Sequence, residues 1–326
     1  MNPQPRHPCL VPRLILGLTA AALPLHAQLT SRSFGSGDNA FTMDFVTIGQ
    51  PGNLGDPGPV TWGSVATVFR MGKYEVSEDM ITKANTLGNL GITTASHSAN
   101  RPATRVSWNE AARFVNWLNV SQGYSPAYKF SQQPGDAGYS ANATISLWTA
   151  TDAGYDANNA YRNARAVYYL PSENQWYKAA YYNPLSSEYY NYPTGSDTAP
   201  KPTAGSVVSG EAVYGNASGP AEIYSAGGLS PYGTMGQGGN AAEWLESAWD
   251  RWNNSPAELR GVMGGYWGSP AVYLMSVARQ NAAPTVEDNG YGFRVAAVPV
   301  PEPSAAIAVS VGLGAWVVLW RRRGFR

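Results

Sequence analysis

Glycine, proline, asparagine and serine interrupt this chain roughly every ten to twenty residues, and such spacing leaves little room for long regular elements. The 326 residues include 35 Gly, 24 Pro, 20 Tyr and 11 Trp, but only 13% are charged, against about 25% in ordinary globular domains. The pattern predicts a loop-rich globular domain held together by aromatic side chains. It excludes a coiled coil, a basic nucleic-acid-binding protein and a charged disordered tail.

Capping signals predict three helices. An acidic first turn after Ser77 begins a helix that should end near Gly88. Ser107 with Glu110, and Ser172 with Gln175, have the spacing of capping boxes and precede apolar residues at helical intervals. Short strands are expected at residues 44–48, 68–76, 167–170, 260–263 and 292–297. Residues 119–165 and 183–240 are expected to be long loops, which are usually functional or tied down, here by a metal or by buried aromatics.

Residues 1–27 have the features of a secretory signal peptide, with basic residues, an apolar stretch at 14–25 and Ala27 before a mature start at Gln28. Cys9 is the only cysteine and lies in this segment, so the mature protein would have no disulfide and no thiol ligand or nucleophile. The terminal segments contain six of the 22 basic residues and one of the 22 acidic ones, which leaves residues 28–299 with a net charge of −5. An acidic domain does not attract phosphate backbones, but it can take a hard cation.

The C-terminal segment, residues 300–326, combines a short motif, an apolar run and an arginine cluster. Pro301, Glu302 and Pro303 precede an apolar run at 305–320, which as a helix would span about 24 Å, close to the bilayer core of about 30 Å. The cluster Arg321, Arg322 and Arg323 should stay on the cytoplasmic side of this transmembrane helix. The arrangement resembles the PEP-CTERM sorting signal; an ordinary tail anchor is the alternative.

The resemblance to PEP-CTERM proteins implies a Gram-negative bacterium and recognition by an exosortase, with cleavage near Pro301–Glu302–Pro303. We therefore expect an exported protein of the cell envelope or extracellular surface, anchored transiently in the inner membrane through residues 305–320 before processing. Such proteins are associated with the cell surface and its exopolysaccharide.

Six further motifs follow one another along the chain: FRMGKYEVS (69–77), PATRVSW (102–108), YLPSENQW (169–176), GNAAEW (239–244), RGVMGGYW (260–267) and GFRV (292–295). In composition and order they resemble the motifs of the formylglycine-generating enzyme, or sulfatase-modifying factor, family. The resemblance covers about residues 41–298 of a domain at 28–299. It implies an irregular α+β fold related to C-type lectins, with low regular secondary structure.

The resemblance implies a copper oxidase, which converts a sulfatase cysteine to formylglycine with two cysteines just after a Gly-Gly-Ser-Trp segment. Here that segment continues as Gly268-Ser269-Pro270-Ala271-Val272-Tyr273, without cysteine, and serine is a poor ligand for Cu(I). The related iron-dependent sulfoxide synthases need three histidines, whereas the mature chain has only His97, which we interpret as a solvated loop residue. We expect neither copper nor iron, and no catalytic residue. A Ser-His-Asp triad would need the same His97, and no nucleophile-elbow motif supports it.

The resemblance also implies a calcium site. In the family, the Asn and Glu of a Gly-Asn-Val-Trp-Glu-Trp stretch hold calcium together with backbone oxygens, and Asn240, Ala241 and Glu243 are the matching positions here. The alternative is that Asn240 caps a turn and Glu243 pairs with an arginine. Residues 215–239 offer no convincing counterpart of the family's second calcium site. Residues 152–158 resemble a calcium loop only faintly, because the closing Glu is missing, and a solvated loop is the preferred interpretation.

The leading hypothesis is an exported, non-catalytic binding or scaffold protein with a formylglycine-generating-enzyme-type domain. Its partners would be the exosortase during sorting and then exopolysaccharide or a surface protein, and not nucleic acid. The alternatives are a formylglycine-generating-type oxidase for sulfatase maturation and a lectin-like carbohydrate binder. A cluster of tyrosines either forms a sugar-stacking platform or packs the core and loops. Its members are Tyr181, Tyr182, Tyr189, Tyr190 and Tyr192.

Overall fold

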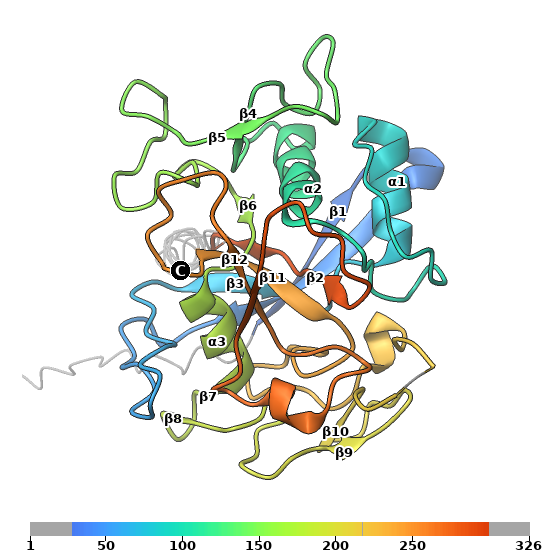
Figure 1. The fold of residues 1–326 in the computed structure, drawn as a ribbon, viewed down its shortest axis with the longest axis vertical. Helices are drawn as coiled ribbons and strands as arrows, with labels where there is room; N and C mark the ends of the chain where they lie inside the picture. The colour runs from blue at the N-terminus through green and yellow to red at the C-terminus, as the bar shows by residue number, and fades with distance from the viewer. Residues whose placement is uncertain (1–27, 217, 300–326) are drawn as a thin grey trace, which may run out of the picture.

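The computed structural model describes residues 28–216 and 218–299, so the predicted signal peptide, the sorting motif and the transmembrane segment at 305–320 lie outside the described residues. No helix in the described part of the chain is long and apolar enough to cross a membrane. The described residues form three α-helices, which Figure 1 shows among short strands and long loops. The helices are α1 (Glu78–Gly88), α2 (Trp108–Ser121) and α3 (Glu173–Tyr181), with short 3-10 helices η1 (Gly37–Asn39), η2 (Ile223–Ser225) and η3 (Ala271–Leu274). The strands are β1 (Leu29–Phe34), β2 (Phe41–Ile48), β3 (Phe69–Gly72), β4 (Lys129–Phe130), β5 (Ile145–Ser146), β6 (Tyr168–Tyr169), β7 (Tyr182–Asn183), β8 (Glu188–Tyr189), β9 (Lys201–Pro202), β10 (Glu211–Ala212), β11 (Ala242–Ala248), β12 (Arg260–Met263), β13 (Gln280–Ala282), β14 (Tyr291–Gly292) and β15 (Ala296–Ala297).

The three predicted helices form where their caps predict them. The Ser107 hydroxyl accepts from the Glu110 amide, and the Glu110 carboxylate accepts from the Ser107 amide at 2.8 Å. Ser172 and Gln175 form the same reciprocal pair at the start of α3. The helix α1 ends at Gly88 and is capped by Asn89, whose φ of 49° is the left-handed conformation common after a helix. Both capping boxes are confirmed.

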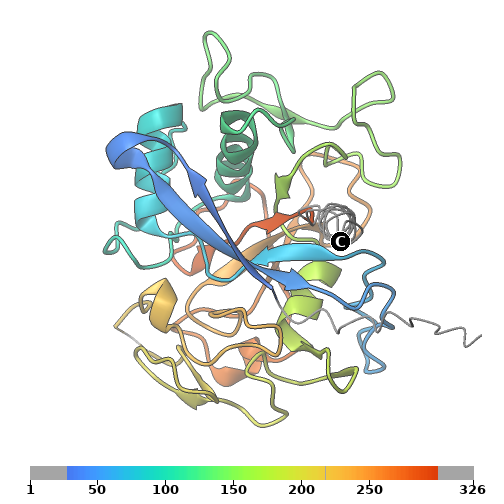
Figure 2. The same cartoon turned by 180° about the vertical axis from the view of Figure 1, so that it is seen from behind.

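The main sheet has five antiparallel strands in the order β1-β2-β3-β15-β6, so the beginning and the end of the described chain share one sheet. In Figure 2 the long β1–β2 hairpin crosses the face of the molecule. The single strand expected at 292–297 is wrong, because β14 pairs in parallel with β11 in a second sheet whereas β15 pairs with β3. Between them the chain passes from one sheet to the other, and the Arg294 side chain is buried in this crossing.

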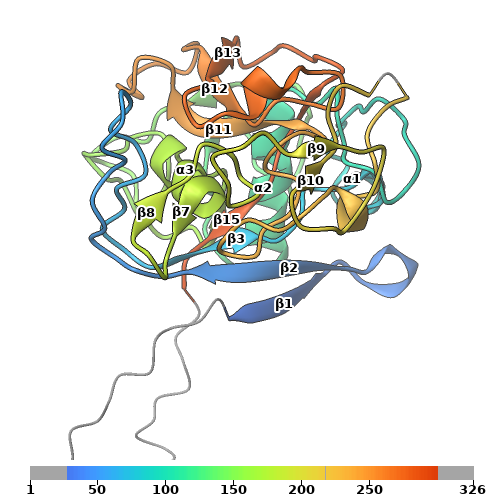
Figure 3. The ribbon, with the colours of Figure 1, turned by 90° about the horizontal axis from the view of Figure 1, so that it is seen from below.

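The second sheet has the order β13-β12-β11-β14. Its central strand β11 was not predicted, because two glutamates interrupt the apolar pattern of its sequence AEWLESA, yet six of its seven residues are buried. Figure 3 shows the β1–β2 hairpin on one side of the molecule and β11–β13 on the opposite side, with α2 and α3 between them. The described domain is therefore α+β, with little regular secondary structure.

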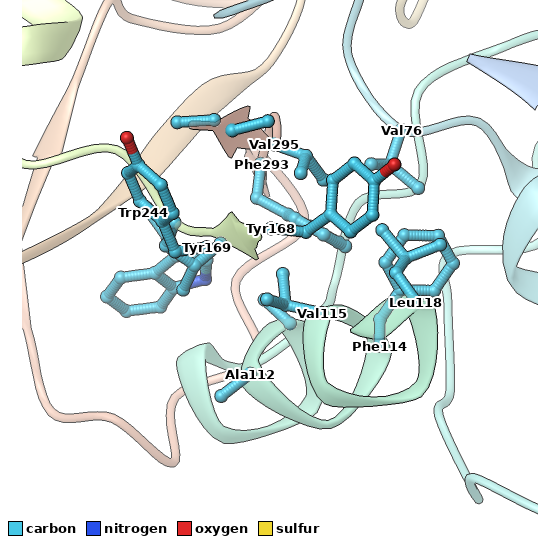
Figure 4. Close-up of a cluster of buried hydrophobic side chains, with 14 of the residues drawn as sticks. Val76, Ala112, Phe114, Val115, Leu118, Tyr168, Tyr169, Trp244, Phe293 and Val295 are labelled. Carbon is cyan, nitrogen blue, oxygen red and sulfur yellow. The ribbon is translucent and has the colours of Figure 1, made fainter. Parts of the chain in front are cut away.

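The core fills the space between the two sheets. Phe114, Val115 and Leu118 project from α2 toward Tyr168 of β6 and Phe293 (Figure 4). The rings of Phe114 and Phe293 meet edge to face at 5.6 Å. Aromatic packing therefore holds this loop-rich fold, as the composition predicts.

Candidate functional site

Glu243 and Arg294 form a fully buried ion pair between β11 and the β14–β15 crossing. Arg294 Nε donates to Glu243 Oε2 and Nη2 donates to Oε1, each at 2.6 Å, which is the two-bond geometry that arginine and carboxylate prefer. Trp176 Nε1 of α3 donates to the same Oε2 at 2.6 Å. The remaining guanidinium nitrogen–hydrogens reach the carbonyl oxygens of Gly72 and Met235, both at 2.9 Å. One charge pair therefore joins α3, β11, the end of β3 and the loop that contains Met235.

Asn240 lies beside this pair with φ of 59° and no exposed surface. Its Oδ1 accepts from the Ala221 amide at 2.8 Å, and its Nδ2 donates to Glu75 Oε2 at 2.7 Å. Glu75 Oε1 accepts from the Ala241 amide at 2.9 Å. Desolvation, and secondarily the negative charge of Glu243, raises the pKa of Glu75 to about 8. Asn240 thus orders two loops.

The donor oxygens predicted for calcium do not fit a cation in this arrangement. Calcium takes six to eight oxygens at about 2.3–2.6 Å, whereas both oxygens of Glu243 already accept from Arg294 and Asn240 Oδ1 already accepts from a backbone amide. The guanidinium supplies the positive charge that a metal would supply. Within 28–216 and 218–299, no group of three or more His, Cys, Asp or Glu side chains could hold a metal ion. The geometry follows the alternative, in which Glu243 pairs with an arginine.

The segment that would hold the family's copper cysteines is only partly buried: Ser269 and Leu274 are buried, whereas Gly268, Pro270, Val272 and Tyr273 are exposed. Ser269 is 3% exposed, and its hydroxyl accepts from the Tyr266 amide at 3.0 Å while its carbonyl accepts from Gly215. Leu274, at the end of η3, packs against Tyr192 and Ala212. The Tyr181 hydroxyl donates to the carbonyl oxygen of Leu274 at 3.1 Å. Ser269 therefore closes a turn, and no base contacts its hydroxyl among the described residues.

His97 is not the solvated loop residue that we expected. Its ring is partly buried, lies edge-on to Trp267 at 5.6 Å and contacts the Thr104 hydroxyl through Nε2 at 3.2 Å. Desolvation lowers the pKa of His97, which favours the neutral ring. The sequence missed this packing because Trp267 is 170 positions away.

The loop at residues 152–158 uses its carboxylates locally. Asp152 Oδ2 accepts from Lys129 Nζ at 2.6 Å and from the Thr149 amide at 2.7 Å. These bonds hold the pKa of Asp152 at about 2. Asp156 Oδ1 accepts from the Asn158 amide at 2.9 Å. Both carboxylates therefore stabilise turns, in line with the interpretation as a solvated loop.

A cavity of about 770 Å³ opens between the loop that follows β2 and the β7–β8 hairpin. We name it the tyrosine cavity; it is lined by residues 50–57, Tyr182, residues 187–190 and Asp197. Its volume lies in the range of small-ligand sites, about 300–1,000 Å³. Gln50 and Ser187, on its two sides, have φ of 55° and 60°, which non-glycine residues adopt uncommonly.

The tyrosine cluster divides into core and cavity members. Tyr181, Tyr182 and Tyr192 are buried, whereas Tyr189 and Tyr190 are partly exposed. The rings of Tyr182 and Tyr189 pack at 4.9 Å. The core interpretation therefore holds for Tyr181, Tyr182 and Tyr192, whereas a sugar-stacking role of Tyr189 and Tyr190 stays a prediction.

Hydrogen bonds join the loop at residues 50–57 to Tyr189 of β8 and Tyr177 of α3. Asn53 Nδ2 donates to the Tyr189 hydroxyl at 2.7 Å, which itself donates to the Leu54 carbonyl at 2.9 Å. Asp56 accepts from the Tyr177 hydroxyl at 2.5 Å. Asn53 and Asp56 could not be predicted from the sequence, because they lie in a Pro- and Gly-rich loop without a periodic pattern, more than 120 residues before the hairpin.

The comparisons with known proteins agree on the fold. The search of curated proteins returned no match. Among solved structures, Treponema denticola variable protein 1 has a TM-score of 0.54 at 20% identity, with 82% of this chain and 99% of that chain covered. CarF has a TM-score of 0.56 at 17% identity, covering 79% of this chain and 99% of that one. PvdO from Pseudomonas aeruginosa has a TM-score of 0.49 at 18% identity, over 82% and 98% of the two chains. At these identities, the likeness to the first two structures shows a shared fold alone. The model of the family "Sulfatase-modifying factor enzyme 1-like domain" matches residues 41–298, and the chain therefore belongs to this family.

Proposed function

We propose that this protein is an exported, non-catalytic binding protein of the sulfatase-modifying-factor type, and that it binds oligosaccharide in the tyrosine cavity. The observation that supports the proposal most is the cavity itself, where the rings of Tyr189 and Tyr190 lie beside hydroxyl, amide and carboxylate groups. A pyranose ring has an apolar face that packs on an aromatic ring and a hydroxylated rim that needs such polar partners. The relation to C-type lectins that the sequence motifs imply, if it holds for this domain, points to the same class of ligand.

The environment of Ser269 supports the non-catalytic part of the proposal. A copper oxidase of this family needs thiolate ligands, and the sequence contains no cysteine other than Cys9. Ser269 and Leu274 contribute their groups to turns and packing instead. A binding role needs only the rigid scaffold, which the aromatic core supplies.

The terminal segments support export. In this proposal the signal peptide directs residues 28–299 outward, and an exosortase recognises Pro301, Glu302 and Pro303 before the domain associates with exopolysaccharide or a surface protein. Deleting residues 300–326 should release the protein from the cell envelope into the medium, as measured by immunoblots of cell fractions. Retention in the envelope without this segment would contradict the sorting role.

Titration calorimetry of the full chain with oligosaccharides tests the binding role. Tyr190→Ala removes an aromatic ring from the cavity, and the Tyr190 hydroxyl accepts one hydrogen bond, from Asn183 Nδ2 at 3.2 Å. The substitution should weaken oligosaccharide binding about tenfold. Tyr155→Ala, at an exposed tyrosine of the 152–158 loop, is the matched control and should leave binding unchanged. Formylglycine formation in a Cys-x-Pro-x-Arg peptide by the full chain would overturn the non-catalytic assignment.

A further inference from the structure

We propose that the tyrosine cavity selects oligosaccharides with free amino groups over their neutral and acidic counterparts. The inference rests on the proposed function, since it assigns a ligand chemistry to the same cavity. It comes from the charges that line the cavity together with its aromatic walls.

Three carboxylates line the tyrosine cavity, those of Asp56, Glu188 and Asp197, and no lysine or arginine belongs to its lining. The Asp56 carboxylate accepts only from neutral donors, the Tyr177 hydroxyl and the Gly58 amide. Asp197 likewise accepts from the Asn191 amide at 3.0 Å. None of the three takes part in an ion pair among residues 28–216 and 218–299, whereas Glu173, Glu243 and Glu246 all do. The cavity therefore has negative charge without a counterion from the described chain.

Lys178 of α3 is a buried cation that contacts two residues of the lining. Its Nζ donates to the carbonyl oxygen of Gln50 at 2.7 Å and lies 5.7 Å from the centre of the Tyr182 ring. Gln50 and Tyr182 both line the cavity, whereas Lys178 itself does not belong to the lining. Lys178 thus supports the wall and does not neutralise the carboxylates through an ion pair.

The walls determine which cation fits. Tyr189 and Tyr190 present partly exposed rings, and the hydroxyls of Ser187 and Tyr190 lie on the same lining. An amino sugar offers a ring face for the tyrosines, hydroxyls for these polar groups and an ammonium for the carboxylates. A uronic acid would bring its own carboxylate against Asp56, Glu188 and Asp197, and like charges at such distances repel. The complete set of partners therefore favours the amino sugar.

Binding of the full chain to three tetrasaccharides of equal length tests the inference. The probes are a glucosamine tetramer with free amines, its N-acetylated counterpart and a galacturonic acid tetramer. We expect the free-amine tetramer to bind at least tenfold more tightly than the acetylated one, and this advantage should shrink between 50 and 500 mM salt. The galacturonic acid tetramer should bind more weakly than both.

The variant Glu188→Gln/Asp197→Asn removes two charges and keeps the side-chain shapes. One exposed charge pair contributes about two- to fivefold in affinity. The affinity of the double variant should therefore fall about tenfold for the free-amine tetramer and less than threefold for the acetylated one. Asp38→Asn is the matched control, because Asp38 is exposed on η1, which contacts α1 far from β8 (Figure 1). It should change neither affinity.

Three other results would contradict the selectivity for amino sugars, the proposed function or both. Equal affinity for the free-amine and acetylated tetramers would overturn the inference and leave the proposed function intact. Binding of none of the three would overturn both. Tetralysine binding as tightly as the glucosamine tetramer would show that the cavity recognises a cationic peptide, and would overturn the assignment to sugar.

Discussion

Replacing Glu243 by Gln should strongly lower the free energy of unfolding of this protein, whether or not calcium is present. The change keeps the size of the side chain but removes the only carboxylate that binds Arg294 among residues 28–216 and 218–299, and Arg294 has no exposed surface. One of the two 2.6 Å bonds from the guanidinium would then meet an amide NH₂, which is itself a donor. The perturbation leaves a buried positive charge without its counterion.

The expected magnitude follows from this burial. Removing one partner of a buried ion pair costs about 3–5 kcal/mol, because the remaining charge stays desolvated. Trp176 Nε1 shares Glu243 Oε2, so its bond is put at risk as well, within the same total. Domains are usually stable by about 5–15 kcal/mol, so the loss is a large fraction of the total.

Urea unfolding followed by tryptophan fluorescence, with either calcium or a chelator present, measures the effect. Glu211→Gln is the matched control, since Glu211 pairs with Lys201 at 3.0 Å on the surface, where the lysine side chain is 77% exposed. That change should cost less than about 1 kcal/mol. Glu243→Gln/Arg294→Met, which removes both charges, should recover much of the stability.

Two results would refute this reasoning. A loss below 1 kcal/mol in Glu243→Gln would mean that Arg294 finds another counterion or water. A calcium-dependent rise in the stability of the unmodified protein, absent from Glu243→Gln, would restore Asn240, Ala241 and Glu243 as a metal site.

Three further predictions follow from the same network and its surroundings. Because the pKa of Glu75 is raised in the folded state, its contribution to stability is full below pH 4.5 and is lost as pH rises through about 8. The urea midpoint of the unmodified protein should therefore fall more steeply between pH 5 and 8 than that of Glu75→Gln. Parallel plots of urea midpoint against pH for the two proteins would contradict this. Gly239→Ala should destabilise the fold by more than about 1 kcal/mol in the same assay, since φ is 87° and the new Cβ would lie 2.2 Å from the Val213 oxygen; an unchanged midpoint would contradict it. Elemental analysis of the dialysed full chain should find no stoichiometric copper or iron, because thiolates and a histidine triad are missing from the sequence after Cys9; one equivalent of either metal would return the oxidase alternative to first place.

Local signals in the sequence determined the helices and several strands. The caps at Ser77, Ser107 and Ser172 are each encoded within four residues, so the chain need not fold for them to be recognised. The strand at 260–263 has the predicted bounds. The family motifs depend on order along the chain, and their match to residues 41–298 confirms the family.

Only the tertiary structure decided the roles of the polar residues. Glu243, Arg294 and Glu75 come from three distant parts of the sequence, and whether a carboxylate binds a metal or an arginine depends on which charge the fold buries beside it. The tyrosine cavity likewise joins residues 50–57 to a hairpin more than 120 positions later. Caps and strands are local, whereas a site depends on long-range packing, and long-range packing has no signature in the spacing of neighbouring residues.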